Sequence, residues 1–275
     1  MKVQGGWHHE KNLASTYGDY GKPREVIGHE KVMSVETNNS QARKRKQVRT
    51  LSIVIPTLNE ENAIERVIKA IPTDELNEMG FEVQILVVDN GSDDRTVELA
   101  KKVGAEVIYE PIRGYGRAYK SGFAQASGDL IATADADLTY PMEDIPKLVK
   151  LLIDEDLDFV TTNRFVNMDP DAMSFRNIFG NVILNLVTRL LYRIDLKDSQ
   201  SGMWLFRKDL LDRMKCRSDG MAFSQELKLE AIHFCNCRWR EVPIKYSVRV
   251  GQLKLSGWRD GFGNLLALIR KRFVR

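Results

Sequence analysis

The chain contains the stretch LIATADAD at residues 130–137, and this stretch decides the fold. Residues 130–134 form an apolar run typical of a buried strand, and the run leads into two acids, Asp135 and Asp137. Side chains two positions apart on an extended strand point to the same side, so both carboxylates can grip one divalent cation. Because open α/β sheets bind ligands at the carboxyl ends of their strands, the stretch predicts a parallel sheet with a cation site at this edge.

A second acidic strand end lies upstream, in the stretch VVDNGSDD at residues 87–94. In proteins, Mg²⁺ and Mn²⁺ usually join a few carboxylates to the phosphates of a bound substrate. Two acidic strand ends at one edge of a sheet therefore predict a site for a nucleotide diphosphate together with Mg²⁺ or Mn²⁺.

Short apolar runs alternate with helical periods from residue 51 onward. The predicted strands are 51–56, 84–89, 105–109 and 130–134, and the predicted helices are 59–71, 93–103 and 115–126. Alternating strands and helices imply parallel pairing through right-handed crossovers. The sequence thus predicts an α/β fold, a three-layer α/β/α sandwich around a mostly parallel sheet.

Composition and length are those of a soluble globular enzyme, with 275 residues of which 43% are hydrophobic and 29% charged. The most apolar segment, 178–192, carries Asn181, Asn185 and Arg189 at every fourth position, which indicates an amphipathic helix rather than a membrane span. The amino terminus lacks the apolar core of a signal peptide, and three cysteines are too few for a disulfide framework. These features favour a cytoplasmic location.

Three parts of the chain differ in character. We expect a flexible basic tail at 1–48, a catalytic domain at 49–250 and a basic amphipathic segment at 251–275. Residues 238–275 hold ten Lys and Arg against two acids, which should attract anionic partners. The mixture of Trp, Phe and Leu with a basic end suits a helix lying in a membrane interface, although a terminal helix packed on the domain fits equally well.

Several motifs follow one another in an order that resembles the signatures of family 2 inverting glycosyltransferases, which have the GT-A fold. The first three are IVIPTLNEE at 53–61, VVDNGSDDRT at 87–96 and the Asp135-Ala136-Asp137 triplet. Three further stretches are similar to the subgroup of dolichyl-phosphate mannose synthase and its polyprenyl-phosphate relatives: RGYGRAY at 113–119, DSQSG at 198–202, and VPI at 242–244 followed by RVGQLK at 249–254.

The resemblance implies roles for individual residues. The donor nucleotide sugar would be bound by Pro56, Thr57, Glu60, Asp89, Arg117 and Asp135, and the metal, Mg²⁺ or Mn²⁺, by Asp135 and Asp137. The acceptor phosphate would be bound by Arg164, Arg176, Gln200 and Arg249, and the catalytic residues would be Asp137, Asp198 and Arg249. For Arg117 and Arg176, a plain surface charge is the alternative interpretation.

The activity implied by the resemblance is inverting transfer of a hexose from GDP-mannose, UDP-glucose or a UDP-N-acetylhexosamine to dolichyl or polyprenyl phosphate. A phosphate acceptor is already anionic near neutral pH, so no strong general base is required. A glycosyltransferase acting on a saccharide hydroxyl is the alternative; it would need a base, for which Asp198 and Glu226 are available.

A second alternative is a non-catalytic basic module that binds nucleic acid or anionic membranes through 43–49 and 238–275. It leaves Asp89, Asp135 and Asp137 without a role, so we expect no nucleic-acid partner. Many members of the resembled subgroup continue into transmembrane helices. Without such helices, this chain is expected to lie peripherally on the cytoplasmic face of a membrane, on an anionic surface or beside a membrane-protein partner.

Overall fold

In the computed structural model of the protein, residues 50–251 and 257–274 are described, and all structural statements below concern them. The expected tail at 1–48, its basic run at 43–49 and the stretch 252–256 lie outside these residues.

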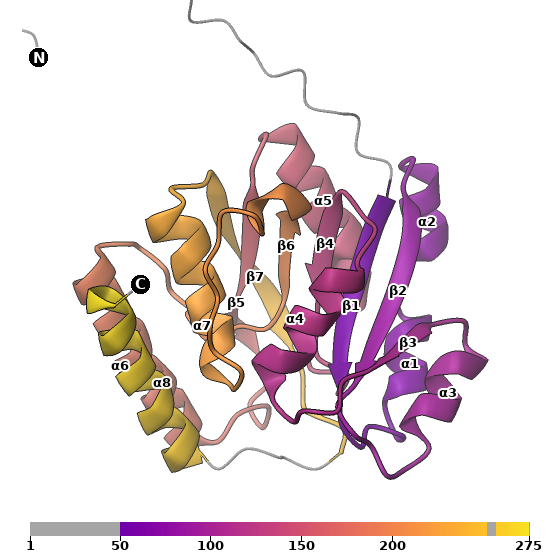
Figure 1. The fold of residues 1–275 in the computed structure, drawn as a ribbon, viewed down its shortest axis with the longest axis horizontal. Helices are drawn as coiled ribbons and strands as arrows, with labels where there is room; N and C mark the ends of the chain where they lie inside the picture. The colour runs from indigo at the N-terminus through magenta and orange to yellow at the C-terminus, as the bar shows by residue number, and fades with distance from the viewer. Residues whose placement is uncertain (1–49, 252–256, 275) are drawn as a thin grey trace, which may run out of the picture. The chain divides into compact units, whose positions relative to one another are not determined.

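The described strands form one seven-stranded sheet in the order β3-β2-β1-β4-β6-β5-β7 (Figure 1). The strands are β1 (Thr50–Thr57), β2 (Glu82–Asp89), β3 (Glu106–Tyr109), β4 (Leu130–Thr133), β5 (Phe159–Met168), β6 (Trp204–Arg207) and β7 (Trp239–Tyr246). Strand β1 pairs in parallel with both β2 and β4, and only β6 runs antiparallel to its neighbours. The predicted mostly parallel sheet is confirmed.

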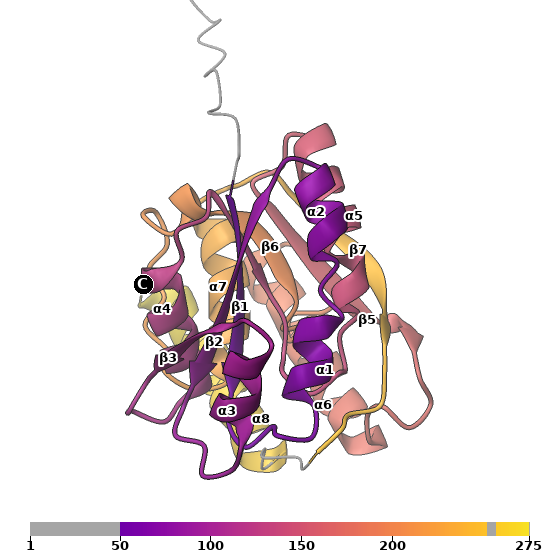
Figure 2. The same cartoon turned by 90° about the vertical axis from the view of Figure 1, so that its right-hand side faces the viewer.

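Helices cover both faces of the sheet (Figures 1 and 2). They are α1 (Ile64–Lys69), α2 (Thr73–Glu78), α3 (Thr96–Lys102), α4 (Tyr115–Gln125), α5 (Ile145–Asp154), α6 (Phe175–Tyr192), α7 (Ala222–Leu229), which a π-helix continues over Glu230–Phe234, and α8 (Gly257–Phe273). Helices α1, α2, α3 and α5 pack on one face, and α4 and α7 on the other. This is the three-layer arrangement that the alternation predicted.

Burial on both faces explains the continuous apolar runs of the central strands. On β1, Leu51, Ile53 and Ile55 join the core under α1 and α5, while Val54 joins the core under α4 and α7. The predicted helix at 59–71 is wrong at its start. Asn59 has φ 52°, in the left-handed region, so the chain turns there and α1 begins only at Ile64.

Helices α6 and α8 lie side by side at the end of the sheet formed by β5 and β7 (Figure 1). The Tyr192 hydroxyl of α6 donates to the carbonyl of Leu268 on α8 at 2.8 Å, and Arg272 Nε donates to the carbonyl of Leu191 at 3.1 Å. Of the two interpretations of the C-terminal segment, packing on the domain is therefore confirmed for α8.

Candidate active site

A cavity of about 440 Å³ lies where the carboxyl ends of β1 and β4 meet α6 and α8. Nine of the residues predicted from the sequence line it: Pro56, Thr57, Glu60, Asp135, Asp137, Arg164, Arg176, Gln200 and Arg249. Segments far apart in the sequence thus converge on one space. The structure does not bring Asp89, Arg117 or Asp198 into this lining.

Asp135 lies at the polar centre of the cavity. Its Oδ1 accepts a hydrogen bond from the Tyr115 hydroxyl at 3.1 Å. Burial, and next the nearby charge of Asp137, raise the pKa of the Asp135 carboxyl to about 7. A Cβ on Gly202 would lie 2.8 Å from the Tyr115 hydroxyl and 3.2 Å from Asp135 Oδ1. The glycine therefore keeps open the space beside this carboxylate.

Asp137 is fixed through both of its oxygens. Oδ1 accepts from the backbone N–H and the hydroxyl of Thr139, at 3.0 and 2.6 Å, and Oδ2 lies 2.6 Å from Nη2 of Arg249. Nη1 of Arg249 lies 4.0 Å from Glu60 Oε1. The segment after β7 thereby closes over the ends of β1 and β4.

The donor groups here suit a hard divalent cation. Asp137 is buried and Asp135 half-buried, and both carboxylates offer oxygen ligands; a cation would relieve the energetic cost of holding the two charges together. Within residues 50–251 and 257–274, no group of three His, Cys, Asp or Glu side chains forms a complete protein cage. A cation at this position would therefore complete its coordination with substrate phosphates and water, as Mg²⁺ and Mn²⁺ commonly do.

Asn90 shapes the neighbouring wall, where the loop before α4 passes. Its Oδ1 accepts from the N–H of Gly114 at 2.7 Å, and its Nδ2 donates to the carbonyls of Glu110 and Ile112, both at 2.9 Å. Gly114 has φ 155° and its missing Cβ would lie 2.4 Å from the Asp219 carbonyl, so only glycine fits. The wall also includes Arg113.

Two of the predicted donor-binding residues lie behind this wall. Asp89 is buried at the end of β2, where its Oδ1 accepts from the N–H of Ser92 at 3.0 Å. Arg117 on α4 faces Glu110 and Asp219, with Nε 3.7 Å from the Glu110 carboxylate. Asp89 thus supports the shape of its loop, and Arg117 takes part in an ion-pair network beside the cavity.

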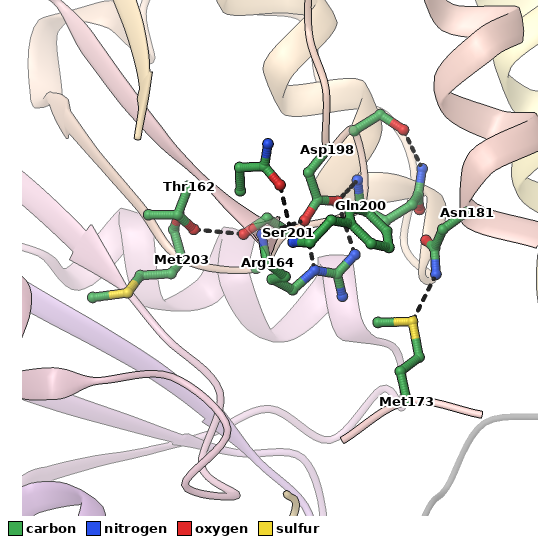
Figure 3. Close-up of polar contacts among 12 residues, drawn as sticks. Thr162, Arg164, Met173, Asn181, Asp198, Gln200, Ser201 and Met203 are labelled. Carbon is green, nitrogen blue, oxygen red and sulfur yellow. Dashed lines mark hydrogen bonds and ion pairs between the residues drawn. The ribbon is translucent and has the colours of Figure 1, made fainter. Parts of the chain in front are cut away.

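At the opposite end of the cavity, Arg164 on β5 is locked to Asp198 (Figure 3). Nε and Nη2 of Arg164 donate to the two oxygens of Asp198 at 2.7 and 2.8 Å, and both residues are buried. Burial alone would raise the pKa of Asp198, but the charge and hydrogen bonds of Arg164 outweigh it and lower the pKa below its usual value. Asp198 is therefore an anionic partner that aims the guanidinium, and it has no oxygen available for accepting a substrate proton.

The loop at 198–202, which carries Gln200 into the cavity, is held by several elements at once. Asn185 on α6 accepts from the N–H of Ser199 at 2.8 Å, and the Tyr140 hydroxyl accepts from the N–H of Gly202 at 2.6 Å. The Gln200 side chain accepts from Asn264 of α8 at 3.0 Å and donates to Gln225 of α7. Helices α6, α7 and α8 therefore jointly determine where Gln200 lies.

Lys228 holds the same loop from beneath. Its ammonium, fully buried, donates to the carbonyls of Ser199 and Ser201, on either side of Gln200. Burial lowers the pKa of Lys228 to about 7, while the charge of Asp198 opposes this shift. The amine thus fixes the backbone of the loop without contacting the cavity.

Sequence reasoning missed five residues that shape the site: Asn90, Tyr115, Gly202, Lys228 and Asn264. The first three lie inside stretches that carry the family resemblance, so the motif order could have indicated them. Lys228 and Asn264 lie in no such motif, and their contacts span 27 to 64 residues. Only the fold shows their proximity to Gln200.

The chain was compared with known proteins. Residues 52–215 match the family model described as glycosyl transferase family 2. Among curated proteins, the low-salt glycan biosynthesis hexosyltransferase Agl6 of Haloferax volcanii is 36% identical over 215 residues, covering 78% of this chain and 51% of that protein. The dolichyl-phosphate hexose transferase of the same organism is 34% identical, covering 77% of this chain and 89% of that protein. The chain thus spans about half the length of Agl6 and most of the second relative.

A solved structure is also similar. Glucosyl-3-phosphoglycerate synthase of Mycobacterium tuberculosis, in complex with Mn²⁺, uridine diphosphate and phosphoglyceric acid, superposes with a TM-score of 0.64 at 25% sequence identity. The match covers 82% of this chain and 78% of that one. The sheet order, the cavity at the carboxyl ends of β1 and β4, and these similarities agree, and the chain belongs to glycosyl transferase family 2, with the GT-A fold.

Proposed function

We propose that this enzyme transfers a hexose, with inversion, from a nucleotide diphosphate sugar to a polyprenyl or dolichyl phosphate, and that the transfer depends on Mg²⁺ or Mn²⁺. The observation that carries the proposal is the ionic character of the two ends of the cavity. The cavity's three carboxylates, Glu60, Asp135 and Asp137, all follow β1 or β4. The end formed by α6, α8 and the loop at 198–202 contributes no carboxylate to the lining.

The hydrogen-bond donors at this end suit a phosphate monoester. They comprise the guanidinium groups of Arg164 and Arg176 and the side-chain amides of Asn177, Gln200 and Asn264. Arginine pairs naturally with phosphate oxygens through its planar fork. The one nearby acid, Asp198, is already bound to Arg164. An acceptor that carries its own negative charge would complement this end of the cavity.

The same geometry defines the chemistry. A phosphate oxygen held by Arg164 and Arg176 would attack the anomeric carbon of the hexose from the side opposite the diphosphate. The bond from that carbon to the diphosphate oxygen breaks, the leaving group keeps the electron pair, and no proton has to move. A divalent cation bound by Asp135 and Asp137 would supply charge stabilisation to the departing diphosphate. The chain's own residues align the two anionic groups, a task in which orientation contributes much of the rate.

A lipid acceptor also agrees with the outward faces of α6 and α8. Ten of the sixteen exposed large hydrophobic side chains among the described residues lie on these two helices: Phe175, Phe179, Val182, Ile183, Leu186 and Leu190 on α6, and Phe262, Leu266, Ile269 and Phe273 on α8. Their spacing places them along one side of each helix. The opposite, buried sides include Asn185, Asn264 and Lys271.

Both helices therefore expose an apolar stripe, whereas their buried sides mix polar with apolar residues, such as Asn185 with Leu184 on α6 and Asn264 with Leu268 on α8. The sequence correctly indicated the polar stripe of α6, but Asn185 lies in the interior instead of facing water. An apolar outer stripe with basic neighbours such as Arg189, Arg193 and Arg270 suits the interface of an anionic membrane. Because the first halves of both helices also line the cavity, a lipid phosphate could enter it directly from that surface.

No helix in the described ranges combines the length and the apolar character needed to cross a bilayer. Because of the apolar outward stripes of α6 and α8, we propose a peripheral location on the cytoplasmic face of a membrane. The high positive charge of 238–275 is partly neutralised within the fold, because Arg238, Arg240, Arg249 and Lys271 form ion pairs with acids of other elements. This leaves little basis for a separate nucleic-acid surface.

The test is a transfer assay with Mn²⁺, a panel of GDP-mannose, UDP-glucose and UDP-N-acetylhexosamines, and a short polyprenyl phosphate, with products identified by mass. The matched acceptor control is the corresponding polyprenol, which lacks the phosphate. We expect a glycosyl phosphate product from one donor, no product from the polyprenol, and loss of product when the metal is chelated.

The saccharide-hydroxyl alternative makes a different demand. It requires a base in the cavity, and Asp135 is the one lining carboxyl whose pKa is raised, to about 7. Transfer to a sugar hydroxyl at a rate equal to or above that for the polyprenyl phosphate would overturn the proposal and assign Asp135 to that role.

A further inference from the structure

We propose that a second cavity, between α7 and α8, binds the phosphate headgroup of an anionic phospholipid. This cavity has a volume of about 400 Å³ and is lined by α7, by the segment that precedes it and by the inner side of α8. It adjoins the active-site cavity, and Asn264 lines both. Neither the family motifs nor the proposed reaction assigns it a role.

The charges along its wall do not balance. Lys271 is neutralised, since its ammonium lies 2.8 Å from Glu226 and 2.6 Å from Glu230. Arg217 and Arg270 also line the cavity, and throughout the described residues neither guanidinium forms an ion pair. Against the carboxylates of Glu226 and Glu230, the three cations at this wall leave a net charge of +1, which favours an anionic occupant.

A buried donor in the same wall lacks an acceptor. Gln225 is only 2% exposed, and its Oε1 accepts from Gln200, while its Nε2 has no hydrogen-bond partner. Buried polar groups in folded proteins are nearly always satisfied, so an orphan of this kind points to a missing ligand. An oxygen of a phosphate would serve both this amide and the two arginines.

Apart from Ser218, Glu226 and Asn264, the remaining lining is apolar, and it leads to the outer surface of α8. It includes Leu229 and Val274, and Leu266, which is also one of the outward-facing residues of α8. The wall thus changes from basic to apolar toward the outer surface of α8. A ligand with an anionic head and an apolar body would contact both parts, whereas a freely soluble anion would contact only the basic part. Anionic phospholipid headgroups are the form in which a membrane surface presents such a molecule.

A ligand bound in this cavity would influence the active site through a chain of side-chain amides. Gln225 contacts Gln200, and Gln200 contacts Asn264, so the three amides form a continuous relay between the cavities. A phosphate that holds Gln225 would also fix Gln200. The effect on the active site rests on the proposed function, in which Gln200 contacts the acceptor. The phosphate-binding site itself does not depend on that function.

The experiment titrates the full chain with dihexanoyl-phosphatidylglycerol below its micelle concentration, beside dihexanoyl-phosphatidylcholine and inorganic phosphate, using calorimetry. The short lipid avoids general attraction to a charged bilayer. We expect saturable binding of the phosphatidylglycerol, and about tenfold weaker binding by the Arg217→Gln/Arg270→Gln variant, as the loss of charge-assisted hydrogen bonds implies. Gln225→Glu keeps an acceptor for Gln200 but turns an oxygen toward the cavity, and it should weaken binding similarly.

The matched control is Lys101→Gln/Lys215→Gln, which removes two exposed charges from outside the cavity wall and should bind as the parent does. Equal weakening in both double variants would overturn the proposal, as would inorganic phosphate binding as tightly as the lipid. An Arg176→Gln variant, which leaves the buried Arg164–Asp198 pair intact, separates this proposal from the proposed function. It should lose transfer and keep phosphatidylglycerol binding, and loss of both would place the lipid in the active-site cavity instead.

Discussion

Nη2 of Arg249 lies 2.6 Å from Oδ2 of Asp137, which joins the segment after β7 to the end of β4. The pair places a guanidinium beside the two carboxylates that the sequence assigned to a metal. In the proposed reaction this arrangement lets one arginine face both the metal ligands and the incoming phosphate. The position of Arg249 thus explains how the end of the domain contributes to chemistry at the central strands.

Asp137→Asn should lower kcat/KM for transfer by about 100-fold or more, because it removes a charged ligand from the centre of the developing charge. The fold should survive, since the amide oxygen can still accept from Thr139. Initial rates across an Mn²⁺ titration measure the effect, and thermal unfolding checks the fold. Asp154→Asn, at an exposed ion pair on α5, is the control. An unchanged Mn²⁺ dependence in Asp137→Asn would contradict the metal assignment.

Asp198→Asn should destabilise the protein by about 3–5 kcal/mol, because it leaves the buried charge of Arg164 without its partner. Urea unfolding measures the change. Asp195→Asn is a control from the same region, where the carboxylate is 69% exposed and pairs with Lys197; its effect should stay below about 1 kcal/mol. A loss of turnover in Asp198→Asn without loss of stability would instead favour a role for Asp198 as a base.

Lys228→Met should change how stability depends on pH. The folded-state pKa of Lys228 is lowered from 10.5 to about 7, so above pH 7 the unfolded chain binds a proton that the folded chain does not. The free energy of unfolding of the parent therefore rises relative to Lys228→Met as the pH increases from about 7 to about 10, by up to about 1.4 kcal/mol per unit. Urea unfolding at several pH values measures the difference. Two parallel curves would show that the amine keeps an ordinary pKa.

The sequence could predict those parts of the fold that depend on local patterns. The double-sided apolar runs of β1 and β4 indicated parallel strands, and the acids that follow β4 indicated the site. The start of α1 could not be predicted, because the left-handed conformation of Asn59 depends on its contacts with the loop at 92–93, which is distant in sequence.

The end of the cavity formed by α6, α8 and the loop at 198–202 shows a second limit of prediction from the sequence. Periodicity showed that α6 is amphipathic, but it does not say which face lies inside. Within the polar stripe of α6, Asn185 is buried because it accepts a hydrogen bond from Ser199 in the loop at 198–202, whereas Arg189 is exposed. The same limit applies to Asp198. From the sequence it is a candidate base, because only the fold shows that it pairs with Arg164 on β5. Residue types are visible in a sequence, whereas the partners that set their chemistry are not.

Phe179→Glu/Leu186→Glu should detach the protein from membranes, because both side chains lie on the outward stripe of α6. Burial of two large apolar side chains at an interface accounts for at least about tenfold in partitioning. Sedimentation with vesicles containing phosphatidylglycerol measures it. The control, Tyr109→Glu/Val166→Glu, removes two equally exposed apolar side chains from elsewhere on the domain and should not alter partitioning. Equal partitioning of both variants would contradict a membrane role for this face.

Gly202→Ala should damage the site although it adds only one methyl group. The new Cβ would lie 2.8 Å from the Tyr115 hydroxyl and 3.3 Å from Asp135 Oδ2, so the tyrosine must move away from the carboxylate it now contacts. A destabilisation of about 1–3 kcal/mol and weaker Mn²⁺ binding are expected. Gly220→Ala is the control, because nothing lies within 4 Å of its added Cβ. Tyr115→Phe removes the atom that collides, and in the Gly202→Ala background it should recover part of the lost stability, a coupling that separate single variants would not reveal. If Gly202→Ala matched Gly220→Ala in unfolding and in Mn²⁺ binding, the space beside Asp135 would have no role in shaping the site.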